Sequence, residues 1–418
     1  MIIFVPITIK LVKMVNRQIY INRLLPFIDR PIIKVLTGIR RSGKSVLLML
    51  LREELKRRGV TDKQIIYINF ESMEYMDVSD AVKLYRYVKE KRIPEQKVYI
   101  LLDEIQNVSE WEKAVNSFMV DWNCDIYLTG SNSRMLSSEL ATLIAGRYIE
   151  IEVEPLSFDE YLHFCGLDES IVGELRFKHF NKFLRLGGFP TIYVGDYNVD
   201  AAYKIISDIY ASVILRDTIQ RNNIRNVELL ERLVRYLFDN VGNLFSAKNI
   251  SDYFKNQQRK LDLNTIYNYL NALEEAFVIR KVNRYNIKGK EILKTNEKYY
   301  MGDHALGYAL MGFHDRWIAG VLENVVMLEL VRRGYKAYVG KLDNREVDFV
   351  GEKGIDRIYI QVAYKLTDAE TVEREFRPLL SIEDHYPKYV VTMDELWKDN
   401  IDGVKHIHIA DFLLKSEW

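Results

Sequence analysis

Eight residues from Gly38 to Ser45 read G-I-R-R-S-G-K-S, which is the spacing G-x-x-x-x-G-K-[ST] of a phosphate-binding loop. Two glycines allow the backbone to turn so that its N–H groups face phosphate oxygens. The ammonium of Lys44 suits the β and γ phosphates of ATP, and the hydroxyl of Ser45 suits Mg²⁺. The alternative is a basic turn without a ligand. The predicted nucleotide-binding residues are Gly38, Ile39, Arg40, Arg41, Ser42, Gly43, Lys44, Ser45 and Val46.

The segments on both sides of this loop have the pattern that such chemistry requires. The apolar run 32–36 predicts a buried strand before the loop. The apolar run that begins at Val46 predicts a helix that continues to about Arg58, with Gly59 as its stop signal. A helix that starts at the loop adds the positive end of its dipole to the phosphate site.

A pair of acids follows a second apolar run. Residues 98–102 predict a central parallel strand that is buried on both faces, and Asp103 and Glu104 come directly after it. Carboxyl ends of parallel strands are where such sheets bind ligands. We expect Asp103 to hold Mg²⁺, directly or through water, and Glu104 to orient or deprotonate a water that attacks the γ phosphate. Two solvated acids at a strand end are the alternative.

Two further polar residues are candidates for catalysis. Residues 125–129 predict a third strand, and Asn132 follows it at a position suited to hold the attacking water; the alternative role is that of a turn residue. Arg147 is either an arginine finger that acts on the nucleotide of a neighbouring subunit or a structural ion-pair residue.

Taken in order, these motifs resemble a known family. The stretches G-I-R-R-S-G-K-S, L-L-D-E-I-Q-N-V, T-G-S-N-S-R-M-L, A-G-R-Y, P-L-S-F-D-E-Y and L-G-G-F-P are similar to those of prokaryotic AAA-type P-loop ATPases whose variable C-terminal domain has no known function. The resemblance runs from about Arg17 to the C-terminus. It implies a parallel sheet in the AAA order, a Walker B glutamate at Glu104 and a sensor-like Asn132.

Composition favours an intracellular, cytoplasmic protein. The chain has 418 residues with 59 basic and 59 acidic side chains, so its net charge does not indicate nucleic acid. Two cysteines, Cys124 and Cys165, argue against a disulfide framework. No apolar run approaches the roughly 20 residues that span a bilayer, so no membrane partner is expected. Translation starts at Met1 or at Met14, because the family-like sequence begins just after Met14.

The predicted fold class is α/β, and changes of pattern divide the chain into five parts. A short appendage, a P-loop core, a helical lid-like segment, a winged helix-turn-helix and a restriction-endonuclease-like α/β domain are expected. Their predicted ranges are 1–16, 17–154, 155–215, 216–312 and 313–418.

Residues 216–300 carry 16 Lys and Arg against 10 Asp and Glu, and their pattern predicts three helices followed by two strands. This winged-helix order suits duplex DNA, although many winged helices bind proteins instead. Outward-facing side chains of the third helix are expected to hydrogen-bond to base edges or phosphates. They are those of Asn264, Thr265, Tyr267, Asn268 and Asn271. The wing is expected to neutralise phosphates with Lys281, Arg284, Lys288, Lys290 and Lys294.

The last hundred residues predict a helix, 318–333, followed by strands at 336–339, 345–350 and 357–365. This order resembles the PD-(D/E)XK nuclease fold, in which acids hold Mg²⁺ and a lysine assists the attacking water. Glu323, Asp348 and Gln361 match the acidic frame, but Ala363 stands where the lysine belongs. Lys365, two residues further along, can replace it only if the strand continues and its side chain is not solvent-facing. We therefore predict a degenerate site.

Three functions remain open after this reading. The first is an ATPase that is associated with DNA, in which the nucleotide state controls the winged helix and the C-terminal domain. The second is an ATP-regulated, metal-dependent nuclease. The third is an ATP-driven switch that binds protein and no nucleic acid. An arginine finger acting between subunits would imply a homo-oligomer.

Overall fold

The computed structural model describes residues 15–132, 146–195, 197–257, 261–312, 314, 317–395 and 400–418. These residues divide into two compact units. The first holds the residues before Glu154 together with 193–195, and the second holds the rest. The predicted boundary after residue 154 lies one residue from this division. The predicted segments 155–215, 216–312 and 313–418 all fall in the second unit, and their separation into domains stays a prediction.

The first unit is built on a sheet of five parallel strands in the order β2-β3-β4-β1-β5. The buried strand before the loop, the central strand before the acid pair and the third strand are confirmed as β1, β3 and β4. The bounds are Ile33–Thr37 for β1, Ile65–Asn69 for β2, Val98–Asp103 for β3, Cys124–Thr129 for β4 and Tyr148–Glu152 for β5.

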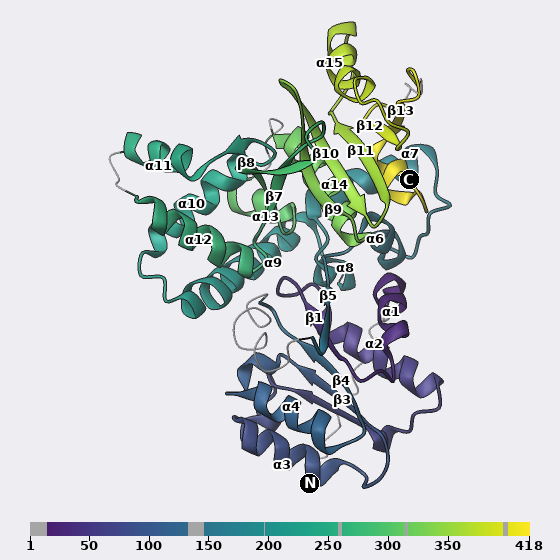
Figure 1. Cartoon of the computed structure of the whole chain (residues 1–418), viewed down its shortest axis with the longest axis vertical. Helices are drawn as coiled ribbons and strands as arrows, with labels where there is room; N and C mark the ends of the chain where they lie inside the picture. The colour runs from purple at the N-terminus through teal and green to yellow at the C-terminus, as the bar shows by residue number, and fades with distance from the viewer. Residues whose placement is uncertain are drawn as a thin grey trace. The chain divides into compact units, whose positions relative to one another are not determined.

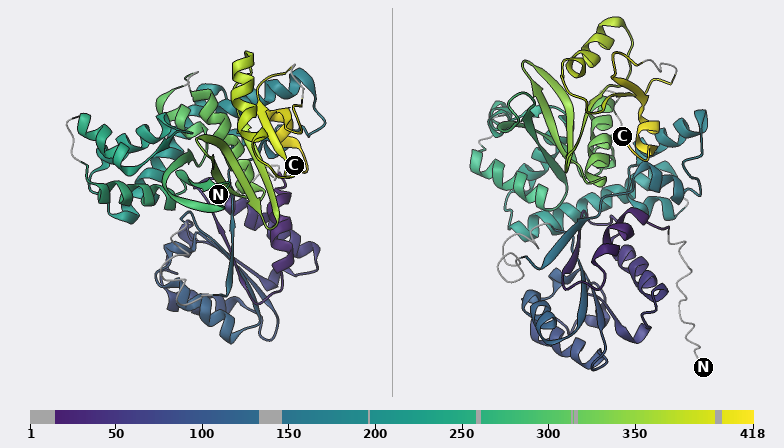
Figure 2. Two further views of the ribbon diagram at one scale, coloured as in Figure 1. Left: turned by 45° about the horizontal axis from the view of Figure 1, so that its top comes forward. Right: turned by 45° about the vertical axis from the view of Figure 1, so that its right-hand side comes forward.

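Helices cover both faces of this sheet (Figure 2). Strand β3 shows why its sequence is continuously apolar. Its residues Ile100 and Leu102 pack into the core beneath α3 and α4, while Tyr99 and Leu101 pack into the core beneath α1 and α2. The bounds are Gln18–Leu24 for α1, Lys44–Arg57 for α2, Ala81–Lys91 for α3 and Trp111–Asp121 for α4.

A buried charge in β1 is neutralised within the sheet. Lys34 is fully buried, and its ammonium is paired with the equally buried carboxylate of Asp125 on β4. The second oxygen of Asp125 accepts a hydrogen bond of 2.7 Å from the backbone N–H of Asp29. Such pairing is what makes a charged residue tolerable in a strand whose neighbours are apolar.

The second unit contains a sheet of eight strands in the order β13-β12-β11-β10-β9-β7-β8-β6. Strands β7 and β8 form the antiparallel hairpin of the segment predicted as a wing, and β7 also pairs in parallel with β9 through Arg284–Asn286. The hairpin is thus joined to the strands of the C-terminal segment in one sheet. The bounds are Leu244–Phe245 for β6, Ile279–Asn286 for β7, Glu291–Met301 for β8, Lys336–Leu342 for β9, Arg345–Lys353 for β10, Asp356–Val362 for β11, Lys388–Thr392 for β12 and Lys405–His408 for β13.

Helices α11 and α12 of this unit begin where the sequence offers side-chain caps. The side chains of Ser246 and Asp262 accept hydrogen bonds from backbone N–H groups at the starts of α11 and α12. Helix α14 packs against β8, β9, β10 and β11, as Figure 1 shows. The bounds are Phe158–Phe164 for α6, Gly173–Leu186 for α7, Val199–Ser212 for α9, Val227–Asp239 for α10, Ala247–Asn256 for α11, Leu263–Glu275 for α12, Ala305–Met311 for α13, Ile318–Arg332 for α14, Ala369–Leu380 for α15 and Ile409–Leu414 for α16. Helix α8, Pro190–Val194, is divided between the units, because residues from Tyr193 belong to the first.

Within the described ranges, no helix is both long enough and apolar enough to cross a membrane.

Candidate functional site

The loop after β1 has the backbone geometry that its glycines were expected to supply. Gly38 has φ +134°, and a Cβ atom there would stand 2.3 Å from the carbonyl oxygen of Val153, so only glycine fits. Gly43 has φ +100° and precedes α2, whose first turn is not capped by any side chain that the structure describes. The N–H groups in the first turn of a helix suit an anion, and α2 begins directly after this loop.

The side chain of Lys44 is buried and lies against the backbone of this loop. Its ammonium donates hydrogen bonds to the carbonyl oxygens of Gly38, at 2.9 Å, and Ile39, at 3.1 Å. The lysine thus folds back over the loop from the first turn of α2. Its charge faces the space that the loop encloses, where phosphates are expected.

A residue that the sequence analysis did not single out supports the loop from outside. Arg17 is 2% exposed, and its guanidinium donates a hydrogen bond of 2.7 Å to the carbonyl oxygen of Ser42. The contact spans 25 residues of sequence. A lone arginine just before a helix has no local pattern that would reveal it.

Replacing Arg17 with Met is expected to weaken ATP binding roughly 10-fold, because a hydrogen bond from a charged group contributes about 1.5–3 kcal/mol. The methionine keeps the apolar volume but leaves the carbonyl of Ser42 without its donor. Titration calorimetry with a non-hydrolysable ATP analogue measures the effect. Arg23→Met, a change on the helix that follows Arg17, is the control and should bind normally. Equal affinities in the two variants would remove Arg17 from the site.

The two acids at the end of β3 are held by one threonine on the adjacent strand. Thr129 donates its hydroxyl hydrogen to Asp103 Oδ1 at 2.5 Å and accepts the backbone N–H of Glu104 at 2.8 Å. Glu104 has φ +55°, in the left-handed region, so the chain turns sharply between the two acids. Both carboxylates lie at the carboxyl edge of the sheet, in line with the prediction for the acid pair.

These residues fit Mg²⁺ and a nucleotide. Burial raises the pKa of Asp103, while hydrogen bonds from Thr129 and Ser45 act to lower it. A buried carboxylate beside a serine hydroxyl is a pair of oxygen ligands that a divalent cation would stabilise. Among the described residues, no hydrogen-bond partner reaches the buried hydroxyl of Ser42, which lies in the same loop.

The remaining predicted loop residues differ in their environments. Ile39 is buried, whereas the side chain of Val46 is 42% exposed. Arg41 has φ +67°, and Arg40 forms an ion pair with Glu71. The backbone of these residues completes the loop, and none of their side chains is needed to explain its shape.

Asn132 and Arg147 lie at opposite ends of the parallel strands. Asn132 is buried just beyond the carboxyl end of β4, the edge that holds the acid pair. Arg147 is exposed at the amino end of β5, where its carbonyl accepts a hydrogen bond from Ile33 N. The length of β1, roughly 15 Å at about 3.3 Å per residue, separates Arg147 from its own phosphate loop.

In the second unit, the side chains predicted to face outward from α12 are accessible. Asn264, Tyr267, Asn268 and Asn271 are exposed, and Thr265 is half-buried with its hydroxyl bonded to Asp262 at 2.7 Å.

The wing side chains are partly engaged. Lys281 is paired with Glu297 at 2.8 Å and Lys288 with Asp343 at 2.6 Å. Lys290 is exposed and Arg284 is half-buried, whereas the side chain of Lys294 lies outside the described residues.

The tip of the β7–β8 hairpin opens into a groove of about 790 Å³. Four basic and three acidic side chains line it, which leaves an excess of one positive charge. The basic residues are Lys288, Lys290, Arg345 and Arg357, and the acidic ones are Asp343, Glu383 and Asp384.

The predicted acidic frame is brought together only in part. The carboxylates of Glu323 on α14 and Asp348 on β10 converge. Gln361 lies beside Asp348, but its amide oxygen accepts from the backbone N–H of Asp348 at 3.3 Å and its nitrogen donates to Glu375 at 3.0 Å. The prediction that strand β11 reaches residue 365 is wrong. The strand ends at Val362, and Lys365 is exposed with its ammonium over the ring of Tyr364.

The lysine of this cluster comes from another strand. Lys298 on β8 is 2% exposed and forms ion pairs with Glu323, Glu346 and Asp348. Lys298 and Tyr300 share one face of the strand, and this alternation is a local sign that Lys298 is buried. The pattern does not identify the carboxylates with which the lysine pairs.

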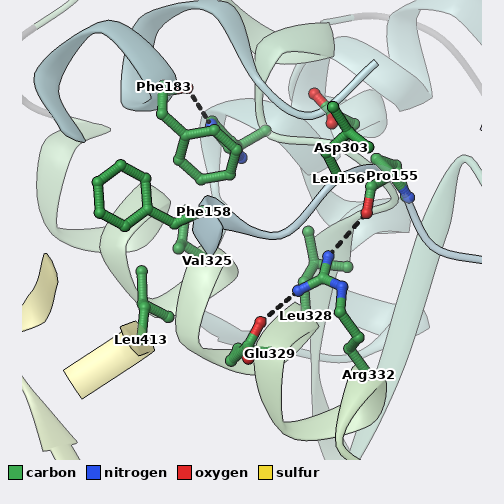
Figure 3. Close-up of a pocket in the computed structure, with 11 residues that line it drawn as sticks. Pro155, Leu156, Phe158, Phe183, Asp303, Val325, Leu328, Glu329, Arg332 and Leu413 are labelled. Carbon is green, nitrogen blue, oxygen red and sulfur yellow. Dashed lines mark hydrogen bonds and ion pairs between the residues drawn. The ribbon is translucent and has the colours of Figure 1, made fainter. Parts of the chain in front are cut away.

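A smaller cavity in the second unit is not a ligand site. It has a volume of about 10 Å³, which holds one water molecule at most. Figure 3 shows Arg332 beside it, bonded to Glu329 and to the carbonyl oxygen of Pro155 at 2.9 Å. These contacts tie the start of the second unit to the end of α14, and their role is structural.

The loop, the acid pair and the sheet order together define an AAA-type P-loop ATPase. Consistent with this class, residues 30–162 match the model of an AAA domain family, and residues 177–316 match that of a domain of unknown function. A solved structure, the Walker-type ATPase of Pyrococcus abyssi, has a TM-score of 0.50 and 16% identity, covering 71% of this chain and 95% of its own. That likeness concerns the fold alone.

Two uncharacterized proteins are related to almost the whole chain. One from Haemophilus influenzae is 40% identical over 403 residues, which is 96% of this chain and 99% of that protein. One from Methanocaldococcus jannaschii is 31% identical over 421 residues, covering 95% of this chain and 90% of that protein. The chain belongs to the same family as these two relatives.

Proposed function

We propose that the chain hydrolyses ATP at the loop between Gly38 and Val46, with Glu104 as the base. The observation that carries the proposal is the contact of Thr129 with both members of the acid pair, which sets Asp103 and Glu104 at the sheet edge where the loop begins. Ser45 and Asp103 are the residues that would hold Mg²⁺, which when bound neutralises charge on the β and γ phosphates.

Each side chain then has a separate task. The ammonium of Lys44 exchanges its bonds to the loop carbonyls for phosphate oxygens and stabilises the charge that develops on the γ phosphate. Glu104 accepts a proton from the water that attacks the γ phosphorus, and the bond to the β–γ bridging oxygen breaks, so that ADP and phosphate form. Asn132 is proposed to orient that water through its side-chain amide.

Arg147 is proposed to act on the nucleotide of a second copy of the chain. Its exposure and its position at the amino end of β5 support this role, because the same geometry separates it from its own loop. Such an arginine stabilises the negative charge of the transition state when another subunit supplies it. The proposal implies a homo-oligomer as the active form.

We further propose that the second unit binds duplex DNA, with α12 and the β7–β8 hairpin as a winged helix. The exposed amides of Asn264 and Asn268 and the hydroxyl of Tyr267 are suitable for base edges or phosphates. Lys288 and Lys290 at the hairpin tip line a groove to which Arg345 and Arg357 add positive charge. The nucleotide state is proposed to control DNA binding at this surface. Measuring ATP turnover with and without duplex DNA tests this coupling.

Changing Lys288, Lys290 and Lys294 together to Glu is expected to weaken duplex binding at least ~100-fold at low salt, irrespective of DNA sequence. Each lost phosphate contact also lowers the slope of log affinity against log salt by about 0.9. Fluorescence anisotropy with a labelled duplex at several salt concentrations measures both quantities.

The matched control reverses three exposed lysines on α3, Lys83, Lys89 and Lys91, which changes the net charge equally. It should bind DNA with the affinity of the unmodified chain. Binding that is insensitive to salt, or equal losses in the two triple variants, would contradict the DNA proposal. A chain that hydrolyses ATP but binds no duplex would instead favour a switch that acts on protein.

A further inference from the structure

The cluster around Lys298 places one ammonium among three carboxylates. Its Nζ atom lies 3.1 Å from Glu323 Oε2, 2.7 Å from Glu346 Oε1 and 3.5 Å from Asp348 Oδ1. Three elements that are distant in sequence supply these groups: β8 the lysine, α14 one acid and β10 the other two. The lysine is almost fully buried, and Glu346 is the most accessible of the three acids.

The carboxylates are held in place by contacts of their own. Tyr300 donates its hydroxyl hydrogen to Glu323 Oε2 at 2.8 Å, and the backbone N–H of Val362 donates to Asp348 Oδ2 at 2.8 Å. Gly242 approaches the same group closely, since a Cβ atom there would lie 3.0 Å from Glu323 Oε2. The acids thus form a preorganised cage and not a loose surface cluster.

The electrostatics of the cage keep the lysine charged. Burial alone lowers the pKa of Lys298, but the surrounding carboxylates outweigh this effect and raise it above its ordinary value. Burial also raises the pKa of Glu323 to about 8 and that of Asp348 to about 6. Without the ammonium, these buried acids would stay ionised only beside another cation and would otherwise take up protons.

The cage does not fit the Mg²⁺ that a nuclease-like fold implies. The ammonium already takes the point where the three carboxylates converge, and a divalent cation bound by oxygen ligands at about 2.0–2.6 Å needs that same point. The side-chain oxygen of Gln361, the remaining oxygen ligand that the fold would offer, already accepts a hydrogen bond from the backbone N–H of Asp348.

We infer that the ammonium of Lys298 occupies the position that a divalent cation would take among Glu323, Glu346 and Asp348. These three carboxylates therefore stabilise the fold and bind no divalent ion. The inference is independent of ATP hydrolysis and of DNA binding. It predicts that loss of the ammonium converts the cage into a divalent cation site with three carboxylate ligands. The half-exposed Glu346 marks the side from which an ion would enter.

The test is a titration of the full-length, nucleotide-free chain with Mn²⁺, followed by electron paramagnetic resonance of the free ion. The unmodified chain and Asp348→Asn should bind the same number of ions, because the cage contributes none. Lys298→Ala should bind one additional Mn²⁺ per chain, and Lys298→Ala combined with Asp348→Asn should lose it. Lys281→Ala, which removes a paired lysine from the neighbouring strand β7, is the control and should gain no ion.

Folding is followed through the thermal midpoint. Lys298→Ala is expected to unfold at a lower temperature than the unmodified chain and to recover on addition of Mn²⁺, whereas the double variant should not recover. A folded Lys298→Ala that gains no ion overturns the inference. If that variant does not fold, the comparison of the unmodified chain with Glu346→Gln decides: an ion lost in Glu346→Gln overturns the inference, and equal stoichiometry supports it.

Discussion

Replacing Glu104 with Gln is expected to leave ATP bound but almost unhydrolysed, with turnover reduced by roughly 10²–10⁴-fold, the range that general-base catalysis contributes. The amide keeps the size of the side chain and its hydrogen bond with Gln106. It cannot accept the proton of the attacking water. The backbone N–H of Glu104 still bonds to Thr129, so the turn after β3 is preserved. Phosphate release and nucleotide retention, measured on the same sample, separate binding from chemistry.

Glu110→Gln is the matched control, because Glu110 is an exposed acid with a similar left-handed backbone at the start of α4. Its turnover should be that of the unmodified chain. Hydrolysis at the normal rate in Glu104→Gln would show that the base lies elsewhere, and loss of nucleotide binding would show that Glu104 is a binding residue.

The change Lys44→Ala is expected to abolish turnover and to weaken ATP binding at least ~100-fold, since removing one partner of a buried, hydrogen-bonded charge pair costs about 2–5 kcal/mol. The triphosphate would then face the loop without the one ammonium that the loop encloses. Titration calorimetry with ATP and Mg²⁺ gives the affinity, and a phosphate-release assay gives the turnover.

Lys56→Ala removes the same side chain from the last turn of α2, where it pairs with Asp62 at 2.7 Å. Binding and turnover should be unchanged in that variant. Comparable losses in both variants would indicate damage to α2 as a whole, and normal ATP affinity in Lys44→Ala would place the nucleotide outside the loop.

The core of the first unit was predictable because its signals are local. A continuous apolar run is what a strand covered on both faces requires, and β3 is such a strand. The spacing of Gly38, Gly43 and Lys44 reflects the geometry of one turn followed by one helix. The carboxyl ends of parallel strands lie at the same end of the sheet. The acid pair and the loop, which follow such strands, are therefore placed at that same end.

The C-terminal part shows where such reasoning stops. Helix α14 and strands β9 to β11 were expected from their patterns, and Glu323 and Asp348 do converge. The predicted extension of β11 to Lys365 was wrong, because an apolar sequence pattern does not show where the pairing with the neighbouring strand ends. Strand β12 pairs in regular register with β11 as far as Val362. Ala363 and Tyr364 keep backbone hydrogen bonds to Val391 and Met393, and the pairing ends before Lys365.

Residue types and short-range spacing were therefore sufficient for the nucleotide loop, its flanking elements and the acid pair, because each depends on backbone turns and alternation within a few residues. Packing between distant segments decided the rest. Arg17 reaches Ser42 across 25 residues, Lys34 finds Asp125 on another strand, and Lys298 enters a cage whose acids come from α14 and β10. A buried charge is stable only beside its partner, and the partner is chosen by the tertiary fold.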